Sequence, residues 1–261
     1  MSPQNYYARR RARRRRAVDM ELVLELVRMQ RREQPCLGGR KLYHLIRPEL
    51  EKAGVKLGRD QFFAELKKAG LLVQRRPSEW PKTTHFDRTL PVFKNRIKGL
   101  QVTGPNQVWV ADITYIRTRE GFVFLALVTD YWSRLIVGFD LNKSLHTQVS
   151  LKALNQGLRG LKEGQKPIHH SDRGSQYAAH AFVERAQQAG LALSMTEKDH
   201  AAENALAERV NGILKQEYWL DMEFEDYRQA RRACAHSIML YNTRRPHCAL
   251  GLRTPAQVHE A

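Results

Sequence analysis

The sequence contains few cysteines and no long apolar segment. Its three cysteines, Cys36, Cys234 and Cys248, have no paired spacing, so neither a disulfide framework nor a structural zinc cluster is indicated. No apolar run reaches the roughly 18 to 20 residues that span a bilayer, and no apolar segment of signal-peptide type follows the arginine-rich start. We therefore expect a cytoplasmic protein without a membrane partner.

Acidic residues are scarce relative to basic ones. The 261-residue chain has 44 Lys and Arg against 27 Asp and Glu, a formal net charge of +17. This excess is larger than solubility requires and indicates a polyanionic partner. Nucleic acid is the first candidate, which would associate the protein with the nucleoid. An anionic membrane surface is a weaker candidate, because no basic amphipathic anchor is present.

The first 16 residues contain no acid at all. We expect like-charge repulsion to keep this arm unfolded until phosphates neutralise it, so that it adds affinity for DNA without sequence specificity. A solvated tail without function is the alternative. An amphipathic helix capped by Asp19 should follow and end at Gln34-Pro35, which completes a segment over residues 1–35. The arginines of the arm are Arg9, Arg10, Arg11, Arg13, Arg14, Arg15 and Arg16.

Residues 36–80 have the pattern of a small helical module. Helices are predicted over Arg40–Leu50 and Arg59–Ala69, with Gly58 as the break between them. Two short basic helices with a glycine turn suit a helix-turn-helix that binds DNA, although any small helical pair has a similar pattern. Residues 81–104 lack a sustained apolar period and are predicted to form a basic linker that follows a phosphate backbone.

Residues 105–220 change to strand periodicity. Three strands joined by short turns predict an antiparallel meander, and two further strands alternate with helices, so the expected class is α/β with a mixed sheet flanked by helices. A basic helix, Phe224–Tyr241, and a tail complete the segment 221–261. The strands are expected over Val108–Ile116, Phe122–Asp130, Arg134–Leu141, Pro167–Ser171 and Leu191–Met195, and the helices over Thr147–Leu161, Tyr177–Ala189 and Asn204–Glu217.

Three acids are the candidate site. Asp112 lies inside a strand of apolar residues, where a charge is expensive unless it is compensated; Asp172 follows a buried strand, and Glu208 lies on a helix. Hard oxygen ligands of this kind suit Mg²⁺ or Mn²⁺. The alternatives are that Asp172 caps the next helix and that Asp112 is a hydrogen-bonded core residue.

The helix of Glu208 carries more candidates. Asn204 and Lys215 share its face at offsets of four and seven residues, so Lys215 could hold a phosphate near a metal, whereas Glu203 points away and Glu217 is expected at the surface.

Four motifs resemble the OrfB-type transposases of bacterial insertion sequences, which belong to the superfamily of DDE transposases and retroviral integrases. The motifs are Trp-x-x-Asp-Ile-Thr-Tyr from 109, His-Ser-Asp-Arg-Gly-Ser-Gln-Tyr from 170, Glu-Asn-Ala-x-Ala-Glu from 203, and Tyr-Asn-x-x-Arg-Pro-His-x-Ala-Leu-Gly from 241. The resemblance covers roughly residues 37 to 257. One departure is the segment 198–205, where the family has a Gly-rich loop and this chain has no Gly or Pro.

The resemblance implies an RNase H-like core in which Asp112, Asp172 and Glu208 bind two Mg²⁺ ions, with Mn²⁺ as a substitute. It implies metal-dependent cleavage at transposon ends, followed by strand transfer from the freed 3′ hydroxyl. Double-stranded DNA is then the partner, contacted by Lys215, Asn204 and the arginine arm, while Arg173 either touches DNA or only shapes its turn. A homo-oligomer on DNA and a product of an upstream reading frame are further expected partners. A non-catalytic DNA-binding regulator and an RNase H-type nuclease without strand transfer remain the alternatives.

Overall fold

The computed structural model describes residues 3–74, 91–197 and 203–261, with the backbone alone at residues 12–14, 17 and 18. The chain divides into two units, one of Met1–Pro77 with Pro246–Leu252 and one of Ser78–Arg245 with Arg253–Ala261. The predicted boundary near residue 80 lies close to this division. No helix within the described ranges combines the length and the apolar character needed to cross a membrane.

The first unit is a helical module, as predicted. Its apolar core joins all three helices, and the two short helices begin and end within two residues of their predicted bounds. The helices are α1 Pro3–Glu33, α2 Gly39–Lys52 and α3 Arg59–Lys68, and the buried core is formed by Val23, Val27, Leu37, Leu42, Ile46, Leu50, Val55, Leu57, Phe62 and Leu66.

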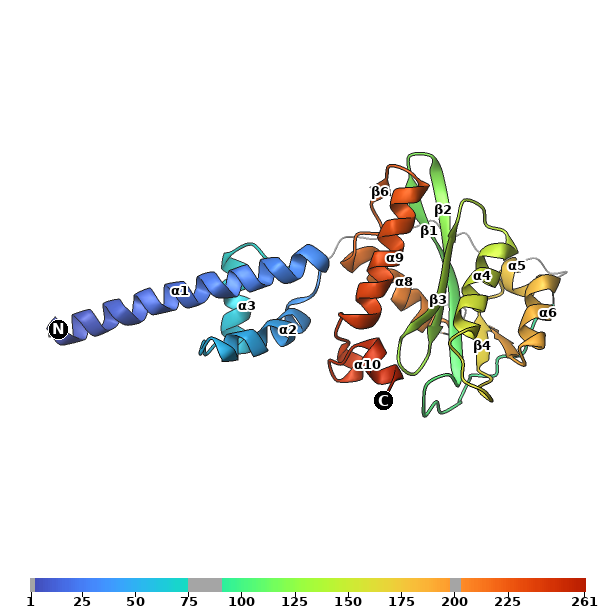
Figure 1. Ribbon diagram of the computed structural model, residues 1–261, viewed down its shortest axis with the longest axis horizontal. Coiled ribbons are helices and arrows are strands. Elements are labelled where there is room, and N and C mark those ends of the chain that lie inside the picture. The colour runs from blue at the N-terminus through green and yellow to red at the C-terminus, as the bar shows by residue number, and fades with distance from the viewer. Residues whose placement is uncertain (1–2, 75–90, 198–202) are drawn as a thin grey trace. The chain divides into compact units, whose positions relative to one another are not determined.

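The basic arm is helical, which corrects the prediction of an unfolded segment. Figure 1 shows α1 as one continuous helix, so Asp19 lies inside it and is not its cap. Arginine is a good helix former, and each like-charge pair costs only about 0.2–0.5 kcal/mol. Val23 and Val27 are fully buried and hold the second half of the helix, from which extension toward the N-terminus is inexpensive. The arginine side chains described in the arm are exposed.

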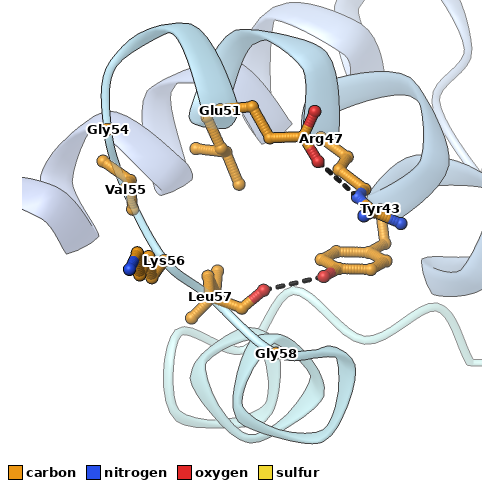
Figure 2. Close-up of a pocket in the computed structure, with 9 residues that line it drawn as sticks. Tyr43, Arg47, Glu51, Gly54, Val55, Lys56, Leu57 and Gly58 are labelled. Atoms are coloured by element: carbon orange, nitrogen blue, oxygen red, sulfur yellow. Dashed lines mark hydrogen bonds and ion pairs between the residues drawn. The ribbon is translucent and has the colours of Figure 1, made fainter.

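A pocket of about 500 Å³ lies at the connection between α2 and α3. Figure 2 shows the Tyr43 hydroxyl donating a hydrogen bond to the Leu57 carbonyl at 2.7 Å. Beside it, Arg47 and Glu51 form an exposed ion pair at 2.7 Å. The tyrosine bond ties the connection to α2, so the position of α3 depends on a side chain as well as on the turn.

The second unit contains the mixed sheet that the periodicity predicts. Strand order is β3-β2-β1-β4-β5, with β6 paired to β1. The β1–β2 and β2–β3 pairs are antiparallel, and the β1–β4 and β4–β5 pairs are parallel. The strands are β1 Val108–Thr118, β2 Gly121–Asp130, β3 Ile136–Asn142, β4 Ile168–Ser171, β5 Ala192–Met195 and β6 Glu223–Phe224, of which only β6 lacked a sequence signal.

Helices cover both faces of this sheet (Figure 1). Trp109 and Ala111 of β1 face α4, α5 and α6, whereas Ile116 of β1 faces α8 and α9. This is the alternation expected for a strand buried on both sides. The helices of this unit are α4 Thr147–Leu158, α5 Ser175–Ala178, α6 His180–Gln188, α8 Ala205–Glu217, α9 Tyr227–Thr243 and α10 Pro255–His259. A short 3-10 helix, η1 Cys248–Leu250, belongs to the first unit.

Three predicted segments differ from the structure. The helix expected over Tyr177–Ala189 is two helices, because Ala179 is extended with ψ near 138°. The basic helix expected over Phe224–Tyr241 is α9 and begins only at Tyr227, because Phe224 belongs to β6, and its apolar residues lie in the same core cluster as the sheet. Of the linker expected over 81–104, residues 81–90 lie outside the described residues. The remainder is bonded to the core, since the Arg96 backbone N–H donates to the Ser194 hydroxyl at 2.8 Å.

Candidate active site

Asp112 lies in the middle of β1, and Asp172 directly follows β4, the strand that pairs with β1. The parallel pairing of β1 with β4 ends at Ala111 and Ser171, so each aspartate is the first residue beyond the same ladder. Neighbouring strands are about 4.8 Å apart. The two carboxylates, sixty residues apart in sequence, are therefore brought together by the register of one strand pair.

Glu208 comes to the same place on α8, which packs against β1. The helix presents an apolar stripe that includes Val210, Ile213 and Leu214 to the sheet and α9. A second stripe of polar residues recurs at offsets of four, seven and eleven residues and consists of Asn204, Glu208, Asn211 and Lys215. Glu208 itself is exposed, whereas the other three members are at most 8% exposed.

The electrostatics show that the three acids act on one another. Burial, the charge of Asp172 and, to a smaller extent, that of Glu208 raise the pKa of Asp112 to about 7, against hydrogen bonds from Asn211 and Ile113. Burial and the charge of Asp172 likewise raise the pKa of Glu208. Such mutual destabilisation of carboxylates is typical of sites that await a cation or a proton.

The turn after β4 presents Asp172. Its Oδ1 accepts a hydrogen bond from the Gly174 backbone N–H at 3.0 Å, and the position preceding α5 is Gly174 with no side-chain cap. Asp172 therefore does not cap that helix. Arg173 donates from Nε to the Thr196 carbonyl at 2.7 Å and from Nη2 to the Glu197 carbonyl at 2.5 Å. Its guanidinium thus binds the chain that follows β5, which favours the shaping of the turn over a contact with DNA.

Two of the candidate DNA contacts on α8 are buried. Asn204 is 3% exposed and donates from Nδ2 to the Ala111 carbonyl at 3.2 Å, so a contact with DNA is not favoured for it. Lys215 is 8% exposed, with its Nζ 4.9 Å from the centre of the Tyr115 ring. Burial lowers the pKa of Lys215 to about 8, against the opposing attraction of Asp112. Of the three acids, Asp112 is the one whose charge acts on Lys215.

The comparisons with known proteins agree with this geometry. Two family models, each described as an Integrase core domain, match residues 102–201 and 189–255. An uncharacterized 31 kDa protein of insertion element IS600 from Shigella sonnei is 34% identical over 94% of this chain and 89% of its own length. A putative transposase of insertion element IS986/IS6110 from Mycobacterium tuberculosis is 32% identical over 83% and 79%. The chain belongs to the insertion-sequence transposases of the DDE and integrase superfamily.

This DDE transposase is a polynucleotidyl transferase with an RNase H-like core. Among solved structures it is similar to a chain of the simian T-cell lymphotropic virus intasome in complex with the PP2A regulatory subunit B56 gamma, with a TM-score of 0.51 and 18% identity. The match covers 86% of this chain and 75% of that chain, and it concerns the fold.

Sequence reasoning missed Asn211, which lies in the core of the transposase at 6% exposure. Its Nδ2 donates to Asp112 Oδ2 at 2.8 Å, while the backbone N–H of Ile113 donates to Oδ1 at 2.9 Å. Both oxygens of Asp112 are thus oriented. The signal in the sequence was the seven-residue spacing from Asn204 and the three-residue spacing from Glu208.

Two further glutamates of the transposase have structural partners. Glu203, which the helical spacing had set aside as a ligand, accepts a hydrogen bond from the Glu197 backbone N–H. Glu217 was expected at the surface, but its carboxylate forms a bidentate ion pair with Arg245, with both contacts at 2.8 Å. The Glu217–Arg245 pair ties α8 to the end of α9, which gives a physical role to the arginine of the Arg-Pro-His motif.

The two histidines before Asp172 pack inside the transposase. Burial lowers the pKa of His169 to about 3, and its ring lies 5.1 Å from that of Phe182 and 5.7 Å from that of Tyr177. The Nδ1 of His170 lies 2.9 Å from the Ser194 hydroxyl. Neither residue is therefore placed as a metal ligand.

The donor chemistry of the three acids suits a hard divalent cation, because carboxylate oxygens are the ligands that such ions prefer and burial penalises the charge of Asp112. In the part of the chain that the structure describes, no three His, Cys, Asp or Glu side chains are close enough to form a ready ligand group. The residues therefore fit the ion in type. Residues 198–202 of the atypical segment before α8 lie outside the described residues.

Proposed function

We propose that this transposase cleaves DNA at the ends of its own insertion element and joins the freed 3′ hydroxyl to a target strand. Asp112, Asp172 and Glu208 would form its catalytic site. The observation that supports this proposal is the convergence of three acids from β1, the end of β4 and α8, with the pKa of Asp112 raised to about 7 partly by the other two.

The three carboxylates would hold two Mg²⁺ ions, for which Mn²⁺ can substitute, and the ions would stabilise the charge that develops on the attacking and leaving oxygens. The chain's own residues provide orientation. The Ile113 N–H and Asn211 fix the two oxygens of Asp112, and the Gly174 N–H fixes Oδ1 of Asp172. The buried ammonium of Lys215 offsets part of the negative charge beside Asp112.

Both reactions are in-line displacements at phosphorus. In cleavage, water forms a new bond to the phosphorus as it loses a proton, and the 3′ oxygen leaves and takes up a proton. In strand transfer, that 3′ hydroxyl attacks a phosphodiester of the target, and the 3′ oxygen of the target strand leaves. One bond forms and one breaks in each step, so no other co-reactant is required.

Binding to double-stranded DNA would come from the basic surface. The arginines of α1 and the helical module of α2 and α3 are the proposed contacts, together with Lys215 once DNA enters the site. The support is the net charge of +17 and the exposure of the arm. A homo-oligomer on DNA, cooperation with the product of an upstream reading frame and a location at the nucleoid belong to the same proposal.

The direct test is an assay of the full chain with DNA that carries the terminal repeats of its element. Purified protein with Mg²⁺ should cut these ends and join them to target DNA. Asp172→Asn should reduce both products at least about a hundredfold, because metal-ion stabilisation of phosphoryl transfer is worth several kcal/mol. Glu163→Gln, an exposed acid of the same unit, is the matched control and should retain activity.

The products also decide between the alternatives. New strand junctions support a transposase, nicks alone would indicate a nuclease, and DNA binding without any product would indicate a regulator. Full activity of Asp172→Asn would refute the proposed site. DNA affinity should change little in that variant, because arginines supply most of it.

A further inference from the structure

Two asparagines tie α8 to β1 on either side of Glu208. Asn204 precedes Glu208 by four residues and donates to the Ala111 carbonyl, and Asn211 follows it by three and donates to the Asp112 carboxylate. By helical spacing all three lie within about 60° of one another around α8. Glu208 thus lies on α8 between two asparagines that are hydrogen-bonded to β1, the strand that contains Asp112.

Both asparagines are buried at positions where a helix packed on a sheet would ordinarily carry an apolar side chain. Asn204 and Asn211 are 3% and 6% exposed, and a buried amide costs about 1–3 kcal/mol wherever it lacks partners. Within the described residues the Oδ1 atom of each has no hydrogen-bond partner. Each asparagine therefore makes one bond to β1 and leaves its Oδ1 without a partner among the described residues, so the cost of burying the amide offsets part of the gain in stability from that bond.

The neighbouring contacts of α8 do not replace these bonds. The apolar stripe of α8 packs on the sheet and on α9, and such apolar contacts are non-directional, so they do not orient the carboxylate of Asp112. The ion pair of Glu217 with Arg245 acts at the opposite end of the helix. In the described part of the chain, the two asparagine bonds join α8 to the Asp112 carboxylate and to the carbonyl of the residue before it.

We infer that Asn204 and Asn211 are positioning residues that set the distance between Glu208 and Asp112 and hold Asp112 ready for a divalent cation. The inference rests on the proposed function, because it concerns the same three acids. Asn211 orients Oδ2 of Asp112, and Asn204 anchors the first turn of α8. Residues that orient metal ligands in this way typically change metal affinity by about 10- to 100-fold when they are lost.

The test compares Asn211→Leu, which keeps the volume but loses the donor, with Asn204→Ala in the full chain. Asn155→Ala is the matched control. The Oδ1 of Asn155 accepts a hydrogen bond of 2.6 Å from Nε of Arg185, and neither residue belongs to the proposed site. The first measurement is the Ca²⁺ concentration that half-saturates the thermal shift of the protein without DNA. The second is the Mg²⁺ concentration that half-saturates strand transfer, with kcat and KM for DNA measured separately.

We expect Asn211→Leu to raise both half-saturating concentrations at least about tenfold and to lower kcat at saturating Mg²⁺, with KM for DNA unchanged. Asn204→Ala should act in the same direction with a smaller change, because it bonds a backbone carbonyl and not a ligand. Asn155→Ala should alter neither quantity. If Asn211→Leu does not fold, Asn211→Ser, which is polar but too short to reach Asp112, takes its place.

Wild-type half-saturation by both ions in folded Asn211→Leu would overturn the inference. So would a lower melting temperature with unchanged metal affinity, which is the mark of a purely structural bond. Asp112→Asn separates this failure from failure of the proposed function. If Asp112→Asn abolishes strand transfer while Asn211→Leu is normal, only the positioning role is wrong, whereas an active Asp112→Asn removes the proposed site itself.

Discussion

Replacement of Asp112 by Asn should stabilise the metal-free protein while it removes activity. The carboxylate of Asp112 lies close to two other acids, and its pKa is raised to about 7. The folded protein therefore holds the proton of Asp112 more tightly than the unfolded chain, in which an Asp has a pKa near 3.9. The ionised form costs stability in the fold, and an amide does not carry that cost.

The magnitude follows from the pKa. A difference of about three units at about 1.4 kcal/mol per unit sets an upper limit of about 4 kcal/mol at pH 8. The new amide keeps an oxygen for the Ile113 N–H, while Asn211 must turn its amide so that Oδ1 accepts from the new N–H. Loss of the charge-assisted bond offsets about half of the gain. We expect a net gain of about 2 kcal/mol, which corresponds to a melting temperature about 4–8 °C higher.

The assay is thermal unfolding in EDTA between pH 5 and pH 8, followed by tryptophan fluorescence. Three of the four tryptophans, Trp109, Trp132 and Trp219, lie in the described part of the unit that contains Asp112, so they report on that unit. The free energy of unfolding that protonation of Asp112 contributes in the wild type is fully present below about pH 4 and is lost as the pH rises through about 7. The advantage of Asp112→Asn should therefore grow toward pH 8, and Mg²⁺ should remove it by stabilising only the wild type.

Glu163→Gln, an exposed acid for comparison, should show no such pH-dependent gain. An Asp112→Asn variant that melts at or below the wild-type temperature at pH 8 would refute the reasoning. A gain of equal size at pH 5 and pH 8 would also refute it, because the effect would then not come from the charge of Asp112.

Three further predictions concern the rest of the chain. Glu217→Gln or Arg245→Met alone should cost about 3–5 kcal/mol in urea denaturation, because each leaves a buried charge unpaired, and the double variant should recover most of it. Removal of residues 1–16 should make the DNA association constant depend less on salt, and should reduce the magnitude of the slope of its logarithm against the logarithm of the salt concentration by up to about 6. Filter binding measures this slope, and catalysis at low salt should not be lost. Gly138→Ala should cost at least about 3 kcal/mol in thermal unfolding, because the new Cβ would overlap a carbonyl oxygen of α4, whereas Gly212→Ala meets no atom within 4 Å and should be neutral or slightly stabilising.

Much of the fold could be predicted because periodicity and burial are local properties of the sequence. The strand alternation of residues 108–116 separates Trp109 and Ala111 from Asp112, and the structure has this division. The arm was predicted wrongly, since its charge repulsion was weighed without the buried half of α1 that supports the helix. Glu217 was also placed wrongly, because its partner Arg245 lies 28 residues away on another element.

The sequence alone determined the order of the five longer strands, the excess of positive charge and the three acids that the family motifs single out, because each of these depends on residue type and spacing. Only the tertiary structure decided how they meet. The register of β1 with β4 sets Asp112 beside Asp172, the packing of α8 on β1 brings up Glu208, and the fold buries Asn204 with its amide donating to the Ala111 carbonyl. These outcomes depend on contacts between residues far apart in the chain, and no local pattern contains them.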